Sequence, residues 1–296
     1  MSGAPRFRVH RRLGIATLAV AALLASASLT GCKPKQGPYV ALGDSYVAGP
    51  LIPDQSTEPL GCLRSTRNWP KRVHEQIGST ELIDVSCSGA QIDDLYEAQG
   101  VSPGPANPPQ LDALTAETTV VTLGIGGNDI GFSDLVQSCG TSFPWDSGCK
   151  GDYVSGGHDE ISDRIAAVAP QLDQAIDDIK ARAPKAFVYV VGYPTVVPAT
   201  GTGCYPLVPV LPSDIPWLRD KVTELNAMIE DVAVANGVQY IDLATPSIGH
   251  DFCSGDRWVE GLVPLSTAAP VHPNAEGMDA FGDIVADAIG VLAPPA

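Results

Sequence analysis

The sequence predicts an α/β domain built on a parallel β-sheet with helices packed on both faces. Short apolar runs alternate with helix-like runs, and the apolar runs resemble buried strands more than strands with one face in water. Loops rich in glycine and proline separate these elements. Because no internal repeat or change of composition interrupts residues 39–296, we expect a single domain over that range.

Five apolar runs are expected to form the sheet, and five longer patterns are expected to form its helices. The expected strands, in chain order, are Tyr39–Leu42, Leu82–Val85, Thr119–Leu123, Ala186–Val191 and Gln239–Ile241. The expected helices are Trp69–Ile77, Asp129–Val136, Ile161–Ala183, Pro216–Asn236 and Ala275–Leu292. Open α/β sheets bind ligands at the carboxyl ends of their strands, so the functional residues are expected in the loops that follow the strands.

The amino-terminal segment predicts export. Four arginines between residues 6 and 12 precede an apolar run over 13–27 that contains no acidic residue, which is typical of a secretory signal and too short for a stable spanning helix. The run ends in LTGC, residues 29–32, which resembles the lipobox of bacterial lipoproteins. That resemblance implies a signal peptide over 1–31, a diacylglycerol thioether on Cys32 and a tether over 32–38. The alternative is cleavage near ASAS, residues 25–28, with Cys32 as a spare thiol.

The cysteine count agrees with export. One of the seven cysteines is Cys32, and the other six lie in the expected domain, where an exported chain would form three disulfides. Among the 15 possible pairings we favour consecutive ones, because each would brace a loop-rich stretch: Cys62–Cys87, Cys139–Cys149 and Cys204–Cys253. A metal site is the alternative, but neither CxxC nor HExxH spacing occurs.

The charge balance excludes some partners. Removing residues 1–31 takes away four of the 18 Lys and Arg and no acid, which leaves 14 against 34 Asp and Glu, a net charge of −20. Such a surface argues against nucleic-acid binding, which needs clustered cations. It also matches anionic membranes poorly, so we expect membrane attachment only through a lipid on Cys32.

Ser45 directly follows the first expected strand, in the run YVALGDSYVAGP, residues 39–50, where a helix would begin. A helix N-terminus offers unpaired N–H groups and a partial positive charge, so a serine there lies in a field that favours a developing anion. Serine and aspartate are also favoured N-caps. This run alone therefore leaves a purely structural role open.

Three later segments favour catalysis by Ser45. Gly89 follows the second strand in SCSGAQIDDL, Asn128 follows the third in LGIGGNDI, and His272 precedes the last helix in VHPNAEG. All would converge on one edge of the sheet. Glycine lets the backbone approach a substrate oxygen and the Asn128 amide supplies a donor, while His272 is the natural proton acceptor for Ser45.

These four blocks, in this order, resemble the SGNH, or GDSL, hydrolase family and span nearly the whole expected domain. The resemblance implies a flavodoxin-like, three-layer α/β/α fold with a central parallel sheet of about five strands. It implies that Ser45 attacks an ester, that His272 acts as base and then acid, and that the Ser45 N–H, Gly89 N–H and Asn128 side chain form an oxyanion hole. The separate GxSxG signature of α/β-hydrolases is absent.

One position departs from the family pattern. The family usually has Asp three residues before its histidine, whereas this chain has Ala269. That aspartate normally holds the imidazole tautomer. Some members use a backbone carbonyl instead, so we expect a Ser45–His272 dyad aided by the carbonyl of Pro270. The alternative is a carboxylate from the 251–260 loop, such as Asp256.

Together these features predict an exported serine esterase or lipase that hydrolyses carboxylic acyl esters through an acyl-enzyme on Ser45. The cysteine pattern resembles the secreted actinobacterial esterase/lipase branch of the family, which favours esters of lipids or small alcohols. We expect no metal or organic cofactor, a monomer, and a location on the outer face of the bacterial cell membrane or, without the anchor, in the medium. A carbohydrate O-deacetylase and a non-catalytic surface binding module are the alternatives.

Overall fold

The computed structural model describes residues 37–292. The expected signal peptide over 1–31, Cys32 and the tether up to residue 36 lie outside the described residues. Within 37–292, none of the helices combines the length and the apolar content needed to cross a membrane.

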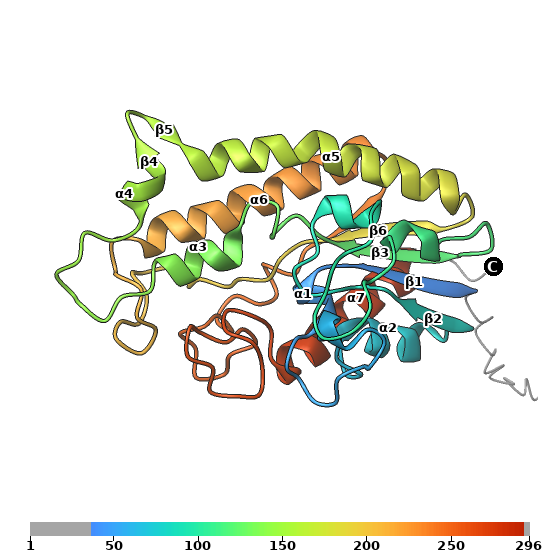
Figure 1. Ribbon diagram of the computed structural model, residues 1–296, viewed down its shortest axis with the longest axis horizontal. Helices are drawn as coiled ribbons and strands as arrows, with labels where there is room; N and C mark the ends of the chain where they lie inside the picture. Colours follow the sequence, from blue (N-terminus) through green and yellow to red (C-terminus); the bar gives the residue numbers. More distant parts are fainter. Residues whose placement is uncertain (1–36, 293–296) are drawn as a thin grey trace, which may run out of the picture. The chain divides into compact units, whose positions relative to one another are not determined.

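Five parallel strands form the central sheet in the order β2-β1-β3-β6-β7 (Figure 1). Their bounds are β1 Pro38–Gly43, β2 Glu81–Asp84, β3 Val120–Gly124, β6 Phe187–Val191 and β7 Gln239–Ile241. Counted along the sheet's own strands this is the 2-1-3-4-5 order of flavodoxin-like folds, which confirms the predicted class. After β1 the chain continues to β2 at one edge of the sheet, whereas after β3 it continues to β6, toward the other edge. The carboxyl ends of β1 and β3 therefore form the switch point where ligands bind in such sheets.

Helices cover the two faces of the sheet (Figure 1). Helices α2 (Trp69–Ile77) and α7 (Ala275–Leu292) pack on one face, and α5 (Glu160–Arg182) and α6 (Ile215–Ala235) pack on the other. Because successive strand residues point to opposite faces, Tyr39 and Ala41 of β1 join the first layer and Val40 and Leu42 join the second. Both layers are apolar, which explains why the strands show no polar alternation.

The remaining elements are short. They are α1 Ser45–Ala48, α3 Phe132–Ser138, α4 Lys150–Tyr153, the hairpin of β4 Val154–Ser155 and β5 His158–Asp159, and three 3₁₀ turns at Leu60–Cys62, Ile92–Leu95 and Gln110–Ala113. The expected helix Asp129–Val136 was wrong at its start. Gly131 has a left-handed φ of +72°, and the Phe132 N–H bonds to the Gly127 carbonyl, so residues 126–131 turn before α3 begins.

Three disulfides join the pairs that the sequence favoured. They are Cys62–Cys87, Cys139–Cys149 and Cys204–Cys253. The first links the loop before α2 to the segment after β2, the second closes the loop between α3 and α4, and the third joins the segments after β6 and β7. Each therefore braces a loop on the carboxyl side of the sheet.

Candidate active site

Ser45 is the first residue of α1 and comes two residues after β1 ends. Gly43 has no room for a side chain, because a Cβ there would meet the Gly124 carbonyl oxygen and the Val47 side chain. Asp44 caps α1 by accepting the Tyr46 N–H at 2.8 Å. The strand thus ends in a tight turn that leaves Ser45 at a helix N-terminus, on the edge predicted for it.

His272 lies directly against this serine. Its Nε2 is 2.7 Å from Ser45 Oγ, and its Nδ1 is 2.7 Å from the carbonyl oxygen of Pro270. A carbonyl only accepts hydrogen bonds, so Nδ1 carries the proton and the Nε2 lone pair faces the Ser45 hydroxyl. Burial lowers the pKa of His272, and the hydrogen bond to Pro270 offsets this only in part. The imidazole is therefore neutral at neutral pH and able to accept a proton.

The competing carboxylate, Asp256, does not contact His272. Its backbone carbonyl lies 2.6 Å from Nδ1 of His250, and its exposed carboxylate is 3.5 Å from the same atom. Asp256 is thus tied to a different histidine. The group bonded to Nδ1 of His272 is the carbonyl of Pro270.

Tyr46 holds the segment that carries this carbonyl. Its hydroxyl donates to the Val271 carbonyl at 2.6 Å, and its ring packs against the His272 ring at 5.2 Å between centroids. Val271 has a φ of +61°, an unfavourable conformation for a β-branched residue. The Tyr46 bond therefore helps to keep the strained turn that aims the Pro270 carbonyl at His272.

Replacing Tyr46 with phenylalanine is expected to lower kcat by about tenfold, because the Val271 carbonyl loses its donor and the turn beside His272 relaxes. The pH dependence of kcat/KM should shift as well, since the partner of Nδ1 moves. Tyr189→Phe is the matched control: the Tyr189 hydroxyl is buried without a hydrogen-bond partner among the described residues, so its removal should leave kcat unchanged. Equal effects of both substitutions on kcat would contradict this role.

Two of the expected oxyanion-hole donors, Gly89 and Asn128, lie on loops that are joined to each other. Asn128 Nδ2 donates to the Ala90 carbonyl at 2.9 Å, and the Ile92 N–H donates to the carboxylate of Asp129 at 3.0 Å. Gly89 has a left-handed φ of +80°, and its N–H has no protein acceptor within residues 37–292. An asparagine amide carries two N–H donors, so one remains for a ligand.

A buried network that the sequence did not reveal ties the serine turn to the Asn128 loop. Tyr193, just after β6, donates to Asp44 at 2.5 Å and accepts the Gly127 N–H at 2.7 Å. Burial raises the pKa of Asp44 to about 7, and the hydrogen bonds from Tyr193 and the Tyr46 N–H only partly oppose this rise. Tyr193 thus fixes the residue before Ser45 and the residue before Asn128 relative to each other.

The space beside Ser45 is small and mostly apolar away from the serine. Phe132 and Leu225 line it together with Asn128 and Tyr193, and its volume is about 10 Å³, roughly room for one water molecule.

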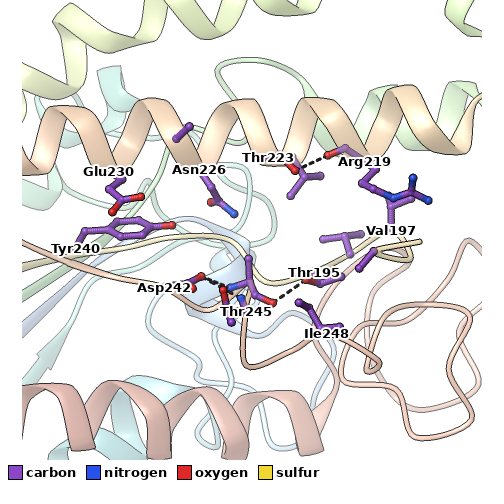
Figure 2. Close-up of a pocket in the computed structure, with 15 residues that line it drawn as sticks. Thr195, Val197, Arg219, Thr223, Asn226, Glu230, Tyr240, Asp242, Thr245 and Ile248 are labelled. Carbon is purple, nitrogen blue, oxygen red and sulfur yellow. Dashed lines mark hydrogen bonds between the residues drawn. The ribbon is translucent and has the colours of Figure 1, made fainter. Parts of the chain in front are cut away.

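A larger cavity of about 560 Å³ lies between α6 and the segments after β6 and β7. Figure 2 shows Glu230 and Asp242 toward one end of it and Arg219 toward the other. Asp242 accepts N–H groups of the turn after β7, and Arg219 donates to carbonyls of the 198–201 loop. Its described lining contains no serine, cysteine or histidine. Within residues 37–292 no group of three His, Cys, Asp or Glu is placed to hold a metal ion.

Fold and site together define a hydrolase with a serine–histidine pair at the switch point of a flavodoxin-like sheet. The chain belongs to the GDSL-like Lipase/Acylhydrolase family, whose model matches residues 41–280. The family resemblance drawn from the four blocks is therefore confirmed.

Relatives and solved structures agree with this membership. "Lipase 2" of Streptomyces coelicolor is 40% identical over 261 residues, and that alignment covers 86% of each of the two chains. "Lipase" of Streptomyces rimosus is 30% identical over 275 residues, which cover 91% of this chain and 95% of the relative. The structure of phospholipase A1 from Streptomyces albidoflavus superposes with a TM-score of 0.67 at 26% identity, and that of the extracellular lipase from Streptomyces rimosus with 0.67 at 27%. Each of these two superpositions covers 85% of this chain and 99% of the chain in the solved structure.

Proposed function

We propose that this protein is an exported serine esterase or lipase that hydrolyses carboxylic acyl esters through an acyl-enzyme on Ser45. The observation that carries the proposal is the 2.7 Å contact between Ser45 Oγ and His272 Nε2, with the other ring nitrogen bonded to a carbonyl. The names of the Streptomyces relatives, lipase and esterase, support the same chemistry.

In the first half of the proposed reaction, Ser45 Oγ attacks the ester carbonyl carbon while its proton moves to His272 Nε2. The carbonyl oxygen becomes an oxyanion, and the Ser45 N–H, Gly89 N–H and Asn128 amide stabilise it. The tetrahedral intermediate then collapses, His272 returns the proton to the departing alkoxide oxygen, and an alcohol leaves. The acyl group remains on Ser45.

In the second half, water attacks the acyl-enzyme and gives its proton to His272. Collapse of the second intermediate breaks the bond to Ser45 Oγ, which recovers the proton from His272. The carboxylic acid leaves, and no cofactor takes part in the proposed cycle. The Pro270 carbonyl stabilises the imidazolium that forms twice, since Nδ1–H donates to it throughout.

The test combines covalent labelling with a series of acyl-chain lengths. A phosphonate ester should inactivate the enzyme, and peptide mass spectrometry should find the adduct on Ser45. Hydrolysis of p-nitrophenyl esters should extend from acetyl to longer chains. A profile restricted to acetyl groups, with turnover of acetylated xylan or peptidoglycan, would favour the carbohydrate deacetylase instead. An unlabelled, inactive protein would favour a binding module.

The acid limb of the pH profile is expected below pH 6.5, the ordinary pKa of histidine, because burial lowers the pKa of His272. Only the neutral ring accepts the Ser45 proton, so kcat/KM should rise with pH through that limb and be lost as pH falls. Asp256→Ala is the control and should keep the wild-type limb, since Asp256 contacts His250. A limb above pH 6.5, or a limb that moves in Asp256→Ala, would contradict this assignment.

We also propose that residues 1–31 are a signal peptide, that Cys32 carries a lipid, and that a tether over 32–38 leads to one domain over 39–296. The lipobox-like LTGC and the odd cysteine support this, as does the extracellular location of the Streptomyces rimosus lipase. Mass spectrometry of the mature N-terminus should show an acylated Cys32. A free N-terminus near Ser28 would contradict the anchor but not the export.

A further inference from the structure

Three loops on the carboxyl side of the sheet carry exposed apolar side chains. The loop closed by Cys139–Cys149, between α3 and α4 in Figure 1, carries a ring pair, Phe143 and Trp145, whose centroids are 5.3 Å apart. The exposed fractions are 54% for Phe143, 78% for Trp145, 54% for Leu207, 65% for Val263 and 68% for Leu265. Exposed aromatic and aliphatic side chains that gather in one region mark an interaction surface.

Hydrogen bonds and contacts hold these loops side by side. The Thr141 N–H donates to the Pro209 carbonyl at 2.7 Å, and Gly140 forms a bridge with Val210. The Val208 side chain lies against Gly261, which joins the second loop to the third. The three loops that carry the apolar side chains are therefore linked to one another.

The third loop is bonded to the segment that carries the catalytic histidine. The Glu260 N–H donates to the His272 carbonyl at 2.9 Å, and the Val271 N–H donates to the Gly261 carbonyl at 3.2 Å. The carboxylate of Glu260 accepts the Leu265 N–H at 2.8 Å. The exposed turn that contains Val263 and Leu265 is therefore bonded to the residue whose backbone contacts His272. Backbone hydrogen bonds thus connect the third loop to the histidine whose ring contacts Ser45.

The charge of the three loops selects the kind of partner. Across residues 139–149, 204–212 and 261–268, Asp146 is the only charged residue, and the chain as a whole is acidic. Binding to an anionic lipid surface needs clustered Lys or Arg, which these loops lack. Trp and Phe on loop tips, with aliphatic neighbours and no cations, match the boundary of a zwitterionic or uncharged lipid layer.

We propose that Phe143, Trp145, Leu207, Val263 and Leu265 form a surface that docks on zwitterionic or uncharged lipid layers and presents the Ser45 site to ester lipids in them. This deepens the proposed function and rests on it for the reaction, but not for the docking. The docking surface inserts apolar side chains and uses no lipid headgroup pocket.

The first test measures binding of the full chain to phosphatidylcholine vesicles by flotation, with Cys32→Ala in every variant so that no acyl chain contributes. The combined variant Phe143→Ser and Trp145→Ser should bind at least tenfold more weakly than its parent and keep the parent's kcat/KM on dissolved p-nitrophenyl butyrate. The control variant is Phe187→Ser and Val234→Ser, and it should bind as the parent does. Both residues are exposed and apolar: Phe187 is the first residue of β6, and Val234 lies in the last turn of α6. Replacing part of the phosphatidylcholine with phosphatidylglycerol should weaken binding.

The second test reports insertion directly and preserves an aromatic ring. Brominated phosphatidylcholine should quench the tryptophan fluorescence of the parent, and Trp145→Phe should remove that quenching while retaining binding. Unquenched fluorescence in the parent, undiminished binding in the double variant, or equal losses in the control variant would each overturn the proposal. So would a dimer of the parent that the double variant dissociates without any lipid present. A parent that floats but does not cleave p-nitrophenyl butyrate contradicts the proposed function alone and supports the docking surface.

Discussion

Replacing Ser45 with alanine is expected to lower kcat on p-nitrophenyl butyrate by on the order of 10⁶-fold, the size of loss found when the nucleophile of a serine protease is removed. The substitution deletes Oγ, the atom that lies 2.7 Å from His272 Nε2, and leaves no other hydroxyl bonded to that nitrogen among the described residues. Acylation then has no nucleophile, although the proposed oxyanion donors remain. Steady-state rates at saturating substrate measure the effect, and circular dichroism should show an unchanged fold.

Ser133→Ala is the matched control for this prediction, since Ser133 lines the same small pocket and has no contact with His272. It should keep the wild-type kcat. Retained hydrolysis in Ser45→Ala, or an equal loss in Ser133→Ala, would contradict the acyl-enzyme on Ser45.

Replacing Asn128 with alanine is expected to lower kcat by about 10²–10³-fold with little change in KM. The amide donates one N–H to the Ala90 carbonyl, and in the proposed mechanism it donates the other to an oxyanion that exists only in the transition state and the intermediates. Loss of such a donor therefore lowers kcat and kcat/KM alike. Rates with a soluble ester, taken over a full range of substrate concentration, separate the two constants.

Gln91→Ala tests whether a disturbed loop would give the same result. Gln91 Nε2 donates to the backbone carbonyl of Asn128 at 3.2 Å, so this variant loosens the same segment but keeps the amide. It should remain close to the wild type. A rise in KM with unchanged kcat in Asn128→Ala would instead assign the side chain to substrate binding.

The sequence predicted the parts of this site that follow strands. Apolar runs revealed where β1 and β3 end, so Ser45 and Asn128 could be placed on one edge before their contacts were known. His272 could be paired with Ser45 because few side chains accept a proton from serine at neutral pH. The flavodoxin-like fold with five parallel strands followed from the family resemblance, and the three disulfides match the consecutive pairs favoured for bracing loops.

The supporting residues could not be predicted in the same way. Tyr46 and Tyr193 act through hydrogen bonds to residues 225 and 149 positions away, and in a sequence a tyrosine beside a strand indicates packing just as well. The left-handed φ of Val271 has no signature in the sequence, since such positions usually hold glycine. The start of α3 was mistaken because a helical pattern does not show that Gly131 ends a turn.

The two members of the dyad lie 227 residues apart, with Ser45 near the start of the described chain and His272 just before the last helix. During synthesis Ser45 is therefore made long before the histidine that contacts it. A chain that ends before residue 272 lacks His272, so under the proposed mechanism it has no proton acceptor for Ser45. The proposed catalytic pair is therefore complete only when synthesis has passed residue 272.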